Sequence, residues 1–349
     1  MRCRNRIHGM LVVAAAAAHG AAVPGTNTPS QPALPAARSL MTGMIHPDGG
    51  GYRHYHVGRC NRSFTLGEVF AGFSAHLEEW TKMGEKSPWW SVDTAIDRGE
   101  GSALSEQKKL AFYRSGVDHV RAVQSDLANA RGRRGPGRRR RPPGSLLDFG
   151  CGLGRLAFAF AHEWPQLRHV ACVDQSAPHL ATAEAEWMLR RGNRSAGSIS
   201  FVRSTPDLLG ALGGRRFDVV HSVLVMQHMV PPLQTIYLQQ LCDALQPNGK
   251  GWIQIPTGES GCYLYRYRGR LGLGKIIGQE ADPCDLSASV REGGMQMHYT
   301  PVADVRRALG SRGCAVLSAK DRGSAHTGGG SECRSHEFVF RKSPARARD

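Results

Sequence analysis

The stretch "SLLDFGCGLGR", from Ser145 to Arg155, decides the fold. Its apolar first half is typical of a buried strand, and its glycines stand at positions 150, 152 and 154, where a helical pattern begins. Glycine accepts positive φ and lets the backbone approach a ligand without a Cβ. The stretch therefore predicts a strand, a tight turn and a helix, and the turn either binds a ligand or is purely structural.

Strands and helices alternate from this stretch onward. Buried-strand patterns at 145–150, 168–174, 198–204, 217–225 and 249–258 are separated by helical patterns at 154–164, 178–192 and 231–249. Such alternation predicts parallel strands with helical crossovers, which is a doubly wound α/β sheet. A last helix at 300–313 and two strands at 314–320 and 336–342 predict an antiparallel hairpin at the sheet edge.

The segment 63–130 predicts a helical addition in front of the sheet. Its first helix is expected to end near Met83, because Gly84 and Pro88 break helices. Residues 105–131 predict a second, amphipathic helix. The apolar face of that helix consists of Leu110, Tyr113, Val117, Val120, Val123 and Leu127.

The two ends of the chain lack a sustained apolar period. Residues 1–62 are rich in Pro, Gly, Ala and Ser and are expected to be mostly disordered, and residues 344–349 form a short tail. The start "MRCRNRIHGMLVVAAAAAHG" joins a basic end to a short apolar run, a pattern of secretory signals, organelle transit peptides and plain alanine-rich tails. Cytoplasmic and organellar locations both stay open, and the run is too short to span a bilayer. The α/β domain is expected over 145–343, and no transmembrane segment is predicted.

Seven arginines lie between Arg131 and Arg141, in a linker that we place at 131–144, and they contribute to a net charge of +16. Such a run suits a polyanion partner, including nucleic acid, or a nuclear import signal. However, the glycines and prolines between the arginines prevent regular structure, and the run enters the first strand at its amino end, away from the glycine turn. A solvated basic loop is therefore the favoured interpretation, and nucleic-acid binding through Arg131–Arg141 is the alternative.

The nine cysteines show no CxxC pair and no metal-like spacing. Cys151, Cys172 and Cys314 lie in or beside apolar runs, where a free thiol behaves as a small apolar side chain. We therefore expect reduced cysteines rather than a disulfide framework. The run "YRHYHVGRC" holds His54, His56 and Cys60, which form no site by themselves, and no metal site is predicted.

The glycine turn favours a ligand with a positive group over a dinucleotide. A dinucleotide needs GxGxxG, whereas the spacing here is GxGxG with Arg155 in the sixth position. Asp148, near the strand end, disfavours a pyrophosphate beside it. Asp174 ends the second strand, where a carboxylate accepts hydrogen bonds from both hydroxyls of a ribose. A nucleoside joined to an amino acid, namely S-adenosylmethionine, satisfies these features.

The series "LLDFGCGLGR", "VACVDQS", "FDVVHSVLVMQHM" and "GKGWIQIP" resembles the ordered motifs of class I S-adenosylmethionine-dependent methyltransferases, over about Leu146 to Ser343. The resemblance implies an enzyme with a Rossmann-like, mostly parallel seven-stranded sheet, a reversed final hairpin, and S-adenosyl-L-methionine as cofactor. The segment "SPWW" also resembles the N-terminal lid of some members. In that case Trp89 and Trp90 cover the cofactor, and packing of a helix is the alternative.

The resemblance also implies which residues contact the cofactor. Asp148 orients the amino group, Asp174 holds the ribose, and Gln175 lies beside the adenine. Thr205 or Asp207, after the third strand, contacts the adenine edge. The complete candidate set is Asp148, Gly150, Cys151, Gly152, Gly154, Asp174, Gln175, Thr205, Asp207 and Ser222, in which residues 150–152 wrap the methionine part.

The acceptor is expected beside "HSVLVMQHM", after the fourth strand. His228 is the candidate general base for a hydroxyl acceptor, and packing at a helix start is its alternative role. A small hydroxylated, carboxylated or sugar-like molecule is the first expectation for the acceptor. A nucleic acid or protein, bound through the arginine run and the Tyr/Arg segment 263–270, is the second. The third is a protein of the same fold that binds without catalysis.

Overall fold

The computed structural model describes residues 55–57, 62–93, 96, 104–130, 142–191, 198–258, 264–268, 274–279, 295–296, 298–323 and 334–344. The N-terminal signal-like segment, His54, Cys60, the arginines at 131–141 and residues 345–349 lie outside these ranges. Within them, no helix is long and apolar enough to cross a membrane.

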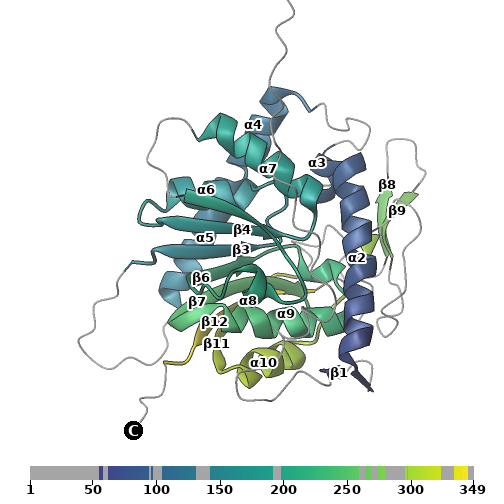
Figure 1. Ribbon diagram of the computed structural model, residues 1–349, viewed down its shortest axis with the longest axis vertical. Helices are drawn as coiled ribbons and strands as arrows, with labels where there is room; N and C mark the ends of the chain where they lie inside the picture. The colour runs from purple at the N-terminus through teal and green to yellow at the C-terminus, as the bar shows by residue number, and fades with distance from the viewer. Residues whose placement is uncertain are drawn as a thin grey trace, which may run out of the picture. The chain divides into compact units, whose positions relative to one another are not determined.

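Seven strands form the main sheet, in the order β11-β12-β7-β6-β3-β4-β5. They are β3 (Ser145–Phe149), β4 (His169–Asp174), β5 (Ser198–Arg203), β6 (Phe217–Ser222), β7 (Leu245–Pro256), β11 (Cys314–Asp321) and β12 (Ser335–Lys342). The strands β5, β4, β3, β6 and β7 run parallel, and β12 lies antiparallel between β7 and β11. The doubly wound sheet with a reversed hairpin that the sequence predicts is thereby confirmed (Figure 1).

Helices cover both faces of this sheet (Figure 1). They are α2 (Leu66–Lys86), α3 (Pro88–Val92), α4 (Glu106–Arg114), α5 (Gly116–Asn129), α6 (Arg155–Glu163), α7 (Ala177–Arg190), α8 (Leu208–Ala211), α9 (Pro231–Asp243) and α10 (Val302–Ser311). Side chains alternate along a strand, so Leu146 packs with α5, α6 and α7 whereas its neighbour Leu147 packs with α9 and α10. Two apolar clusters result, one on each face.

Two small sheets accompany the main one. Strands β1 (Tyr55–Val57) and β2 (Arg62–Phe64) pair antiparallel. Strands β8 (Leu264–Arg268), β9 (Gly274–Gln279) and β10 (Met295–Gln296) form the other. The described part of the Tyr/Arg segment is therefore a strand of a hairpin, β8 with β9.

The helix α2 runs through Gly84 to Lys86, so the predicted end near Met83 is wrong by three residues. Glycine lowers helix propensity, but here its missing side chain allows a close approach to α7. A Cβ at position 84 would lie 2.6 Å from Ser176 Oγ and 3.1 Å from His179 Nδ1. Packing between helices therefore outweighs the local cost of the glycine.

The predicted single helix at 105–131 is two helices, α4 and α5, which meet at Ser115. The Ser115 hydroxyl donates to the Phe112 carbonyl (2.7 Å) and competes with the helical hydrogen bonds. A Cβ on the next residue, Gly116, would lie 2.9 Å from the Arg155 carbonyl oxygen, so the break lets α5 approach α6 closely. Val120 and Val123 are buried as expected, whereas Leu110 is 43% exposed and lies outside the core.

Two strand boundaries also differ from the prediction. The strand predicted at 217–225 ends at Ser222, and a 3-10 helix, η3 (Met226–His228), follows it. Leu224 has a φ of 59°, which no strand accommodates. The helix predicted at 231–249 ends at Asp243, because β7 already begins at Leu245.

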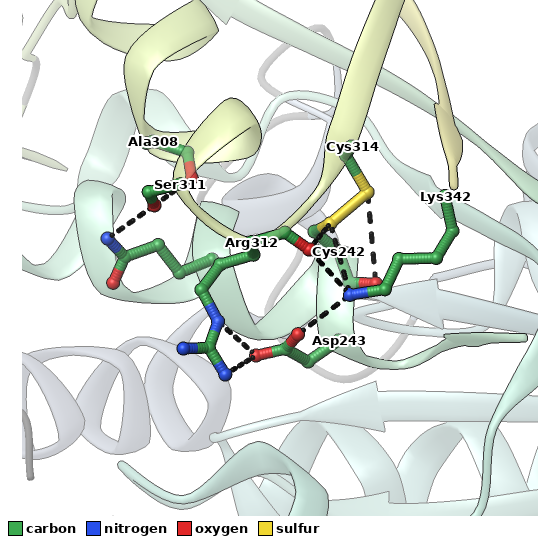
Figure 2. Close-up of a disulfide and its surroundings, with 8 residues drawn as sticks. Cys242, Asp243, Ala308, Ser311, Arg312, Cys314 and Lys342 are labelled. Atoms are coloured by element: carbon green, nitrogen blue, oxygen red, sulfur yellow. Dashed lines mark hydrogen bonds and ion pairs between the residues drawn. A yellow bond between two sulfur atoms is a disulfide. The ribbon is translucent and has the colours of Figure 1, made fainter. Parts of the chain in front are cut away.

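The expectation of reduced cysteines is wrong for four of them. Disulfides join Cys151 to Cys172 and Cys242 to Cys314, at Cα distances of 5.4 and 6.0 Å. The partners are 21 and 72 residues apart in sequence, and only the packing of β3 against β4 and of α9 against β11 brings them together. Figure 2 shows the second disulfide beside Lys342, whose ammonium donates to Asp243 Oδ1 (2.9 Å) and to the Arg312 carbonyl (2.6 Å). These bonds join α9 to the C-terminal hairpin.

Candidate functional site

The carboxyl ends of β3, β4 and β6 meet at one edge of the sheet, and the cofactor turn, residues 150–154, follows β3 there. Its three glycines have φ values of 72°, 53° and 79°, which only glycine adopts readily. The amides of Gly150 and Cys151 both donate to the Val173 carbonyl, at 2.7 and 3.1 Å. A Cβ at Gly150 would lie 2.2 Å from Val225, and one at Gly152 would lie 2.9 Å from Val92. The turn therefore needs glycine for its conformation and for its close neighbours.

Asp148 lies at the carboxyl end of β3 and is 2% exposed. Its Oδ1 accepts a hydrogen bond from His221 Nδ1 (2.8 Å). Its Oδ2 is buried and has no partner in the part of the chain that the structure describes. A buried carboxylate oxygen without a donor is costly, so Asp148 suits a ligand that brings a cationic donor.

Asp174 ends β4 directly beside the cofactor turn. Its Oδ2 accepts from the Gly152 amide and its Oδ1 from the Ser176 amide, both at 2.9 Å. Each carboxylate oxygen has two lone pairs, so both retain capacity for a hydroxyl donor. Gln175, the next residue, is 9% exposed. The structure thus brings Asp148, the turn, Asp174 and Gln175 together, as a nucleoside with an amino-acid end requires.

The residues predicted after β5 are held by their own segment. Thr205 donates to the Asp207 carbonyl (2.7 Å), and the Asp207 carboxylate accepts from the Gly210 amide (2.9 Å) as the cap of α8. Ser204, which the sequence did not single out, is buried beside them and its amide donates to the Asp174 carbonyl (2.8 Å). Its position directly after β5, at the same edge of the sheet, is the sequence signal by which Ser204 could have been added to the candidate residues. Ser222, at the end of β6, is fully buried.

Arg155 is a second residue whose role the sequence did not reveal. It follows the last glycine of the turn, and its Nη1 donates to Ser115 Oγ (3.2 Å). Burial lowers the pKa of the guanidinium, while the nearby carboxylates of Asp93 and Asp148 oppose that shift. Its Nε has no partner among the described side chains. The half-buried guanidinium of Arg155 thus lies near the Asp148 carboxylate.

The N-terminal helices cover this edge. Val92, at the end of α3, lies against Gly152 of the turn. Trp89 packs with Leu104, Phe112 and Leu153, and Trp90 packs with Met83. Trp90 thus belongs to helix packing, the alternative that the sequence left open, whereas Trp89 packs both on helix residues and on Leu153 of the turn, which Val92 contacts as well.

Three histidines from distant segments form a second group, which we call the histidine cluster: His76 of α2, His228 of η3 and His298 before α10. All three are buried, with exposures of 4, 8 and 1%. The His228 ring lies 5.1 Å from the Trp80 ring, and the His76 ring lies 6.2 Å from it. The amide of His298 donates to the carbonyl of Gln227, the neighbour of His228 (2.6 Å). The cluster adjoins the end of β6, where the acceptor is expected.

The electrostatics of this cluster keep His76 neutral. Burial lowers the pKa of His76 to about 3, and His228 and His298 add to that shift. A neutral His76 can accept a hydrogen bond from a hydroxyl, whereas a general base needs a pKa closer to the working pH. Across the described ranges, no group of three or more His, Cys, Asp or Glu is arranged to hold a metal ion.

Comparisons with known proteins give one family match and several structural similarities. Residues 147–250 match the family model described as "Methyltransferase domain". Among solved structures, the magnesium protoporphyrin IX methyltransferase of Synechocystis PCC 6803 with bound SAH is 16% identical, with a TM-score of 0.47 over 78% of this chain and 100% of that one. A methyltransferase of Clostridium acetobutylicum ATCC 824 is 14% identical, with a TM-score of 0.44 over 66% and 92% of the two chains. No curated protein matches the chain in sequence.

Proposed function

We propose that this chain, a class I S-adenosylmethionine-dependent methyltransferase, methylates a hydroxyl group of a small, uncharged acceptor, with His228 as general base. The observation that carries the proposal is the histidine cluster, which places buried imidazoles beside the carboxyl end of β6.

The residues at the strand ends fit S-adenosylmethionine. When bound, the cofactor supplies a methyl group on a positively charged sulfur, which a nucleophile attacks directly. Asp148 would receive its ammonium group, because Oδ2 is the buried oxygen without a donor among the described residues. Asp174 and Gln175 would hold the nucleoside, and the glycines of the turn would let the backbone lie against the methionine part.

The Nε2 atom of His228 is the candidate proton acceptor. It lies 3.2 Å from the side-chain amide of Gln227, and in the tautomer that carries its proton on Nδ1 this Nε2 can accept a proton. An acceptor hydroxyl that replaces this long hydrogen bond would transfer its proton to Nε2 as the oxygen gains the methyl group. Burial lowers the pKa of His76 and keeps this imidazole neutral on the acceptor side. A neutral imidazole accepts a hydrogen bond from an uncharged hydroxyl.

The covering of the site favours a small acceptor. Helix α2 is fixed over the site, because Ser176 Oγ donates to the Trp80 carbonyl (3.0 Å) and Gly84 lies against His179. The imidazoles beneath it are at most 8% exposed. Strand β3, which follows the arginine run in the sequence, begins at Ser145, at the end of the strand opposite the site. A polymer acceptor would need the helices to separate.

The proposal is tested with S-adenosylmethionine labelled in its methyl group. The protein is incubated with pools of small phenols, sugars and carboxylic acids and, separately, with RNA, DNA and a protein extract. We expect label in small molecules, bound as an ether that survives mild base. Base-labile label would show methylation of a carboxylate and contradict the hydroxyl assignment, and label in precipitable polymer would contradict the small acceptor.

A further inference from the structure

A hydrogen-bonded chain of three side chains links helix α5 to the Asp148 carboxylate of the cofactor site. It runs from His119 of α5 to His221 of β6 and on to Asp148 of β3. The two contacts measure 3.0 Å (Nε2 to Nε2) and 2.8 Å (Nδ1 to Oδ1). His221 is fully buried and Asp148 is 2% exposed. The function proposed above uses Asp148 but leaves both histidines without a role.

We propose that His221 is a positioning residue, which orients the Asp148 carboxylate toward the ammonium group of S-adenosylmethionine and is itself held by His119. The inference rests on the proposed role of Asp148. It makes helix α5, outside the region that matches the family model, part of the cofactor site.

The direction of each hydrogen bond follows from the acceptor at the end of the chain. An ionised carboxylate only accepts, so His221 Nδ1 must donate to Asp148 Oδ1. In a neutral ring the other nitrogen is then an acceptor, and His119 Nε2 donates to it. One tautomer of each histidine satisfies the whole chain, so His119 fixes the tautomer that Asp148 needs.

Aromatic rings fix the plane of the His221 imidazole. Trp252 stacks on it, with 5.3 Å between the centroids and 15° between the planes, and Phe160 meets it edge-on at 5.0 Å. His119 meets the same Trp252 edge-on at 5.2 Å. Trp252 in turn donates from Nε1 to Asp126 of α5 (3.2 Å). The imidazole therefore has little freedom to rotate away from Asp148.

The consequence falls on the second oxygen of Asp148. His221 donates to Oδ1 and fixes the plane of the carboxylate, and Oδ2 is the oxygen that has no donor within the described ranges. The charged or titratable groups around His221 in the described part of the chain include His119, Asp148, Asp126 with its partner Lys320 behind Trp252 and, near the Asp148 carboxylate, Arg155. A ligand with an ammonium group binds more tightly because it can donate to Oδ2. A ligand without such a group has no contact with this oxygen and gains no affinity from it.

The experiment compares two ligands that share the nucleoside. S-adenosylhomocysteine carries the amino-acid end, and 5′-methylthioadenosine lacks it. We expect His221→Phe to weaken S-adenosylhomocysteine about tenfold in calorimetric titration, because a charge-assisted hydrogen bond is lost. Binding of 5′-methylthioadenosine should change less than about twofold. His221→Asn, whose side-chain amide can replace the Nδ1 donor, should recover most of the loss, and His119→Phe should cost about threefold.

Two control variants separate the possible failures. His169→Phe changes another strand histidine, at the start of β4, and should leave both affinities unchanged. If Asp148→Asn binds S-adenosylhomocysteine like the wild type, the assignment of Asp148 is wrong and the inference falls with it. If Asp148→Asn weakens binding but His221→Phe does not, only the inference is overturned. Equal weakening of both ligands by His221→Phe would show a merely structural role and overturn it as well.

Discussion

The cofactor turn and the histidine cluster lie at the same edge of the sheet but are assembled in different ways. The turn and its two carboxylates come from one continuous stretch, 148–176, and their positions follow from two adjacent parallel strands. The cluster combines residues 76, 228 and 298, which only the packing of α2 and of the segment before α10 brings together. Local chain geometry builds the first site, and tertiary packing builds the second. Changes in the two sites should therefore affect different steps of the reaction.

The largest effect is expected from His228→Asn. Loss of a general base lowers turnover by about 10²-fold or more, and binding of S-adenosylmethionine should stay within about twofold, because the ring belongs to the acceptor side. Initial rates with the acceptor from the labelled screen, together with calorimetry, measure both quantities. His162→Asn, an exposed histidine on α6, is the matched control. Full turnover by His228→Asn would show that the histidine cluster does not supply the general base.

Asp174→Ala should mainly weaken cofactor binding, whereas His228→Asn should mainly lower turnover. Loss of a carboxylate that accepts from ribose hydroxyls should weaken S-adenosylmethionine at least about tenfold, which corresponds to ~1.4 kcal/mol. Calorimetric titration measures it, with Asp304→Ala on α10 as the control. Part of the loss will come from the amides of Gly152 and Ser176, which lose their acceptor. Equal affinities for wild type and variant would contradict the cofactor assignment.

The histidine cluster should also leave a mark on stability. The pKa of His76 is about 3 in the folded protein against an ordinary 6.5, so the unfolded chain binds more protons between these values. Stability should therefore fall as the pH drops below 6.5, by up to about 1.4 kcal/mol per pH unit from this group alone. Urea unfolding at pH 7.5 and 5.5 measures the loss, and His76→Gln should reduce it. The same pH dependence in both proteins would show that His76 is not buried in the neutral form.

The sequence predicted the turn better than the cluster, and the reason is physical. The seven-stranded sheet and the adjacency of Asp148 and Asp174 follow from local patterns and from the rule for parallel crossovers. His228 was singled out by its place after a strand, whereas His76 reads as one residue of an amphipathic helix. The sequence around His76 does not indicate which residues it contacts or that it is buried. Likewise, the break at Ser115 and the continuity at Gly84 depend on neighbours that only the fold supplies.

The two disulfides extend the comparison to the smallest expected effect. Cys172→Ala removes the link between the cofactor turn and β4, and should weaken S-adenosylmethionine only about threefold, through reduced preorganisation. The effect stays small because three backbone amides of the turn, those of Gly150, Cys151 and Gly152, still donate to the Val173 carbonyl and the Asp174 carboxylate.

The matched variant is Cys314→Ala, which breaks the disulfide at the end of α9, away from the carboxyl ends of the strands. Its cofactor affinity should equal that of the wild type, while its midpoint of thermal unfolding should fall, because the bond closes a long loop. Calorimetry and a thermal melt distinguish the two variants. If Cys314→Ala weakened the cofactor as much as Cys172→Ala, the turn would depend on the packing of the whole sheet, and its contrast with the histidine cluster would be lost.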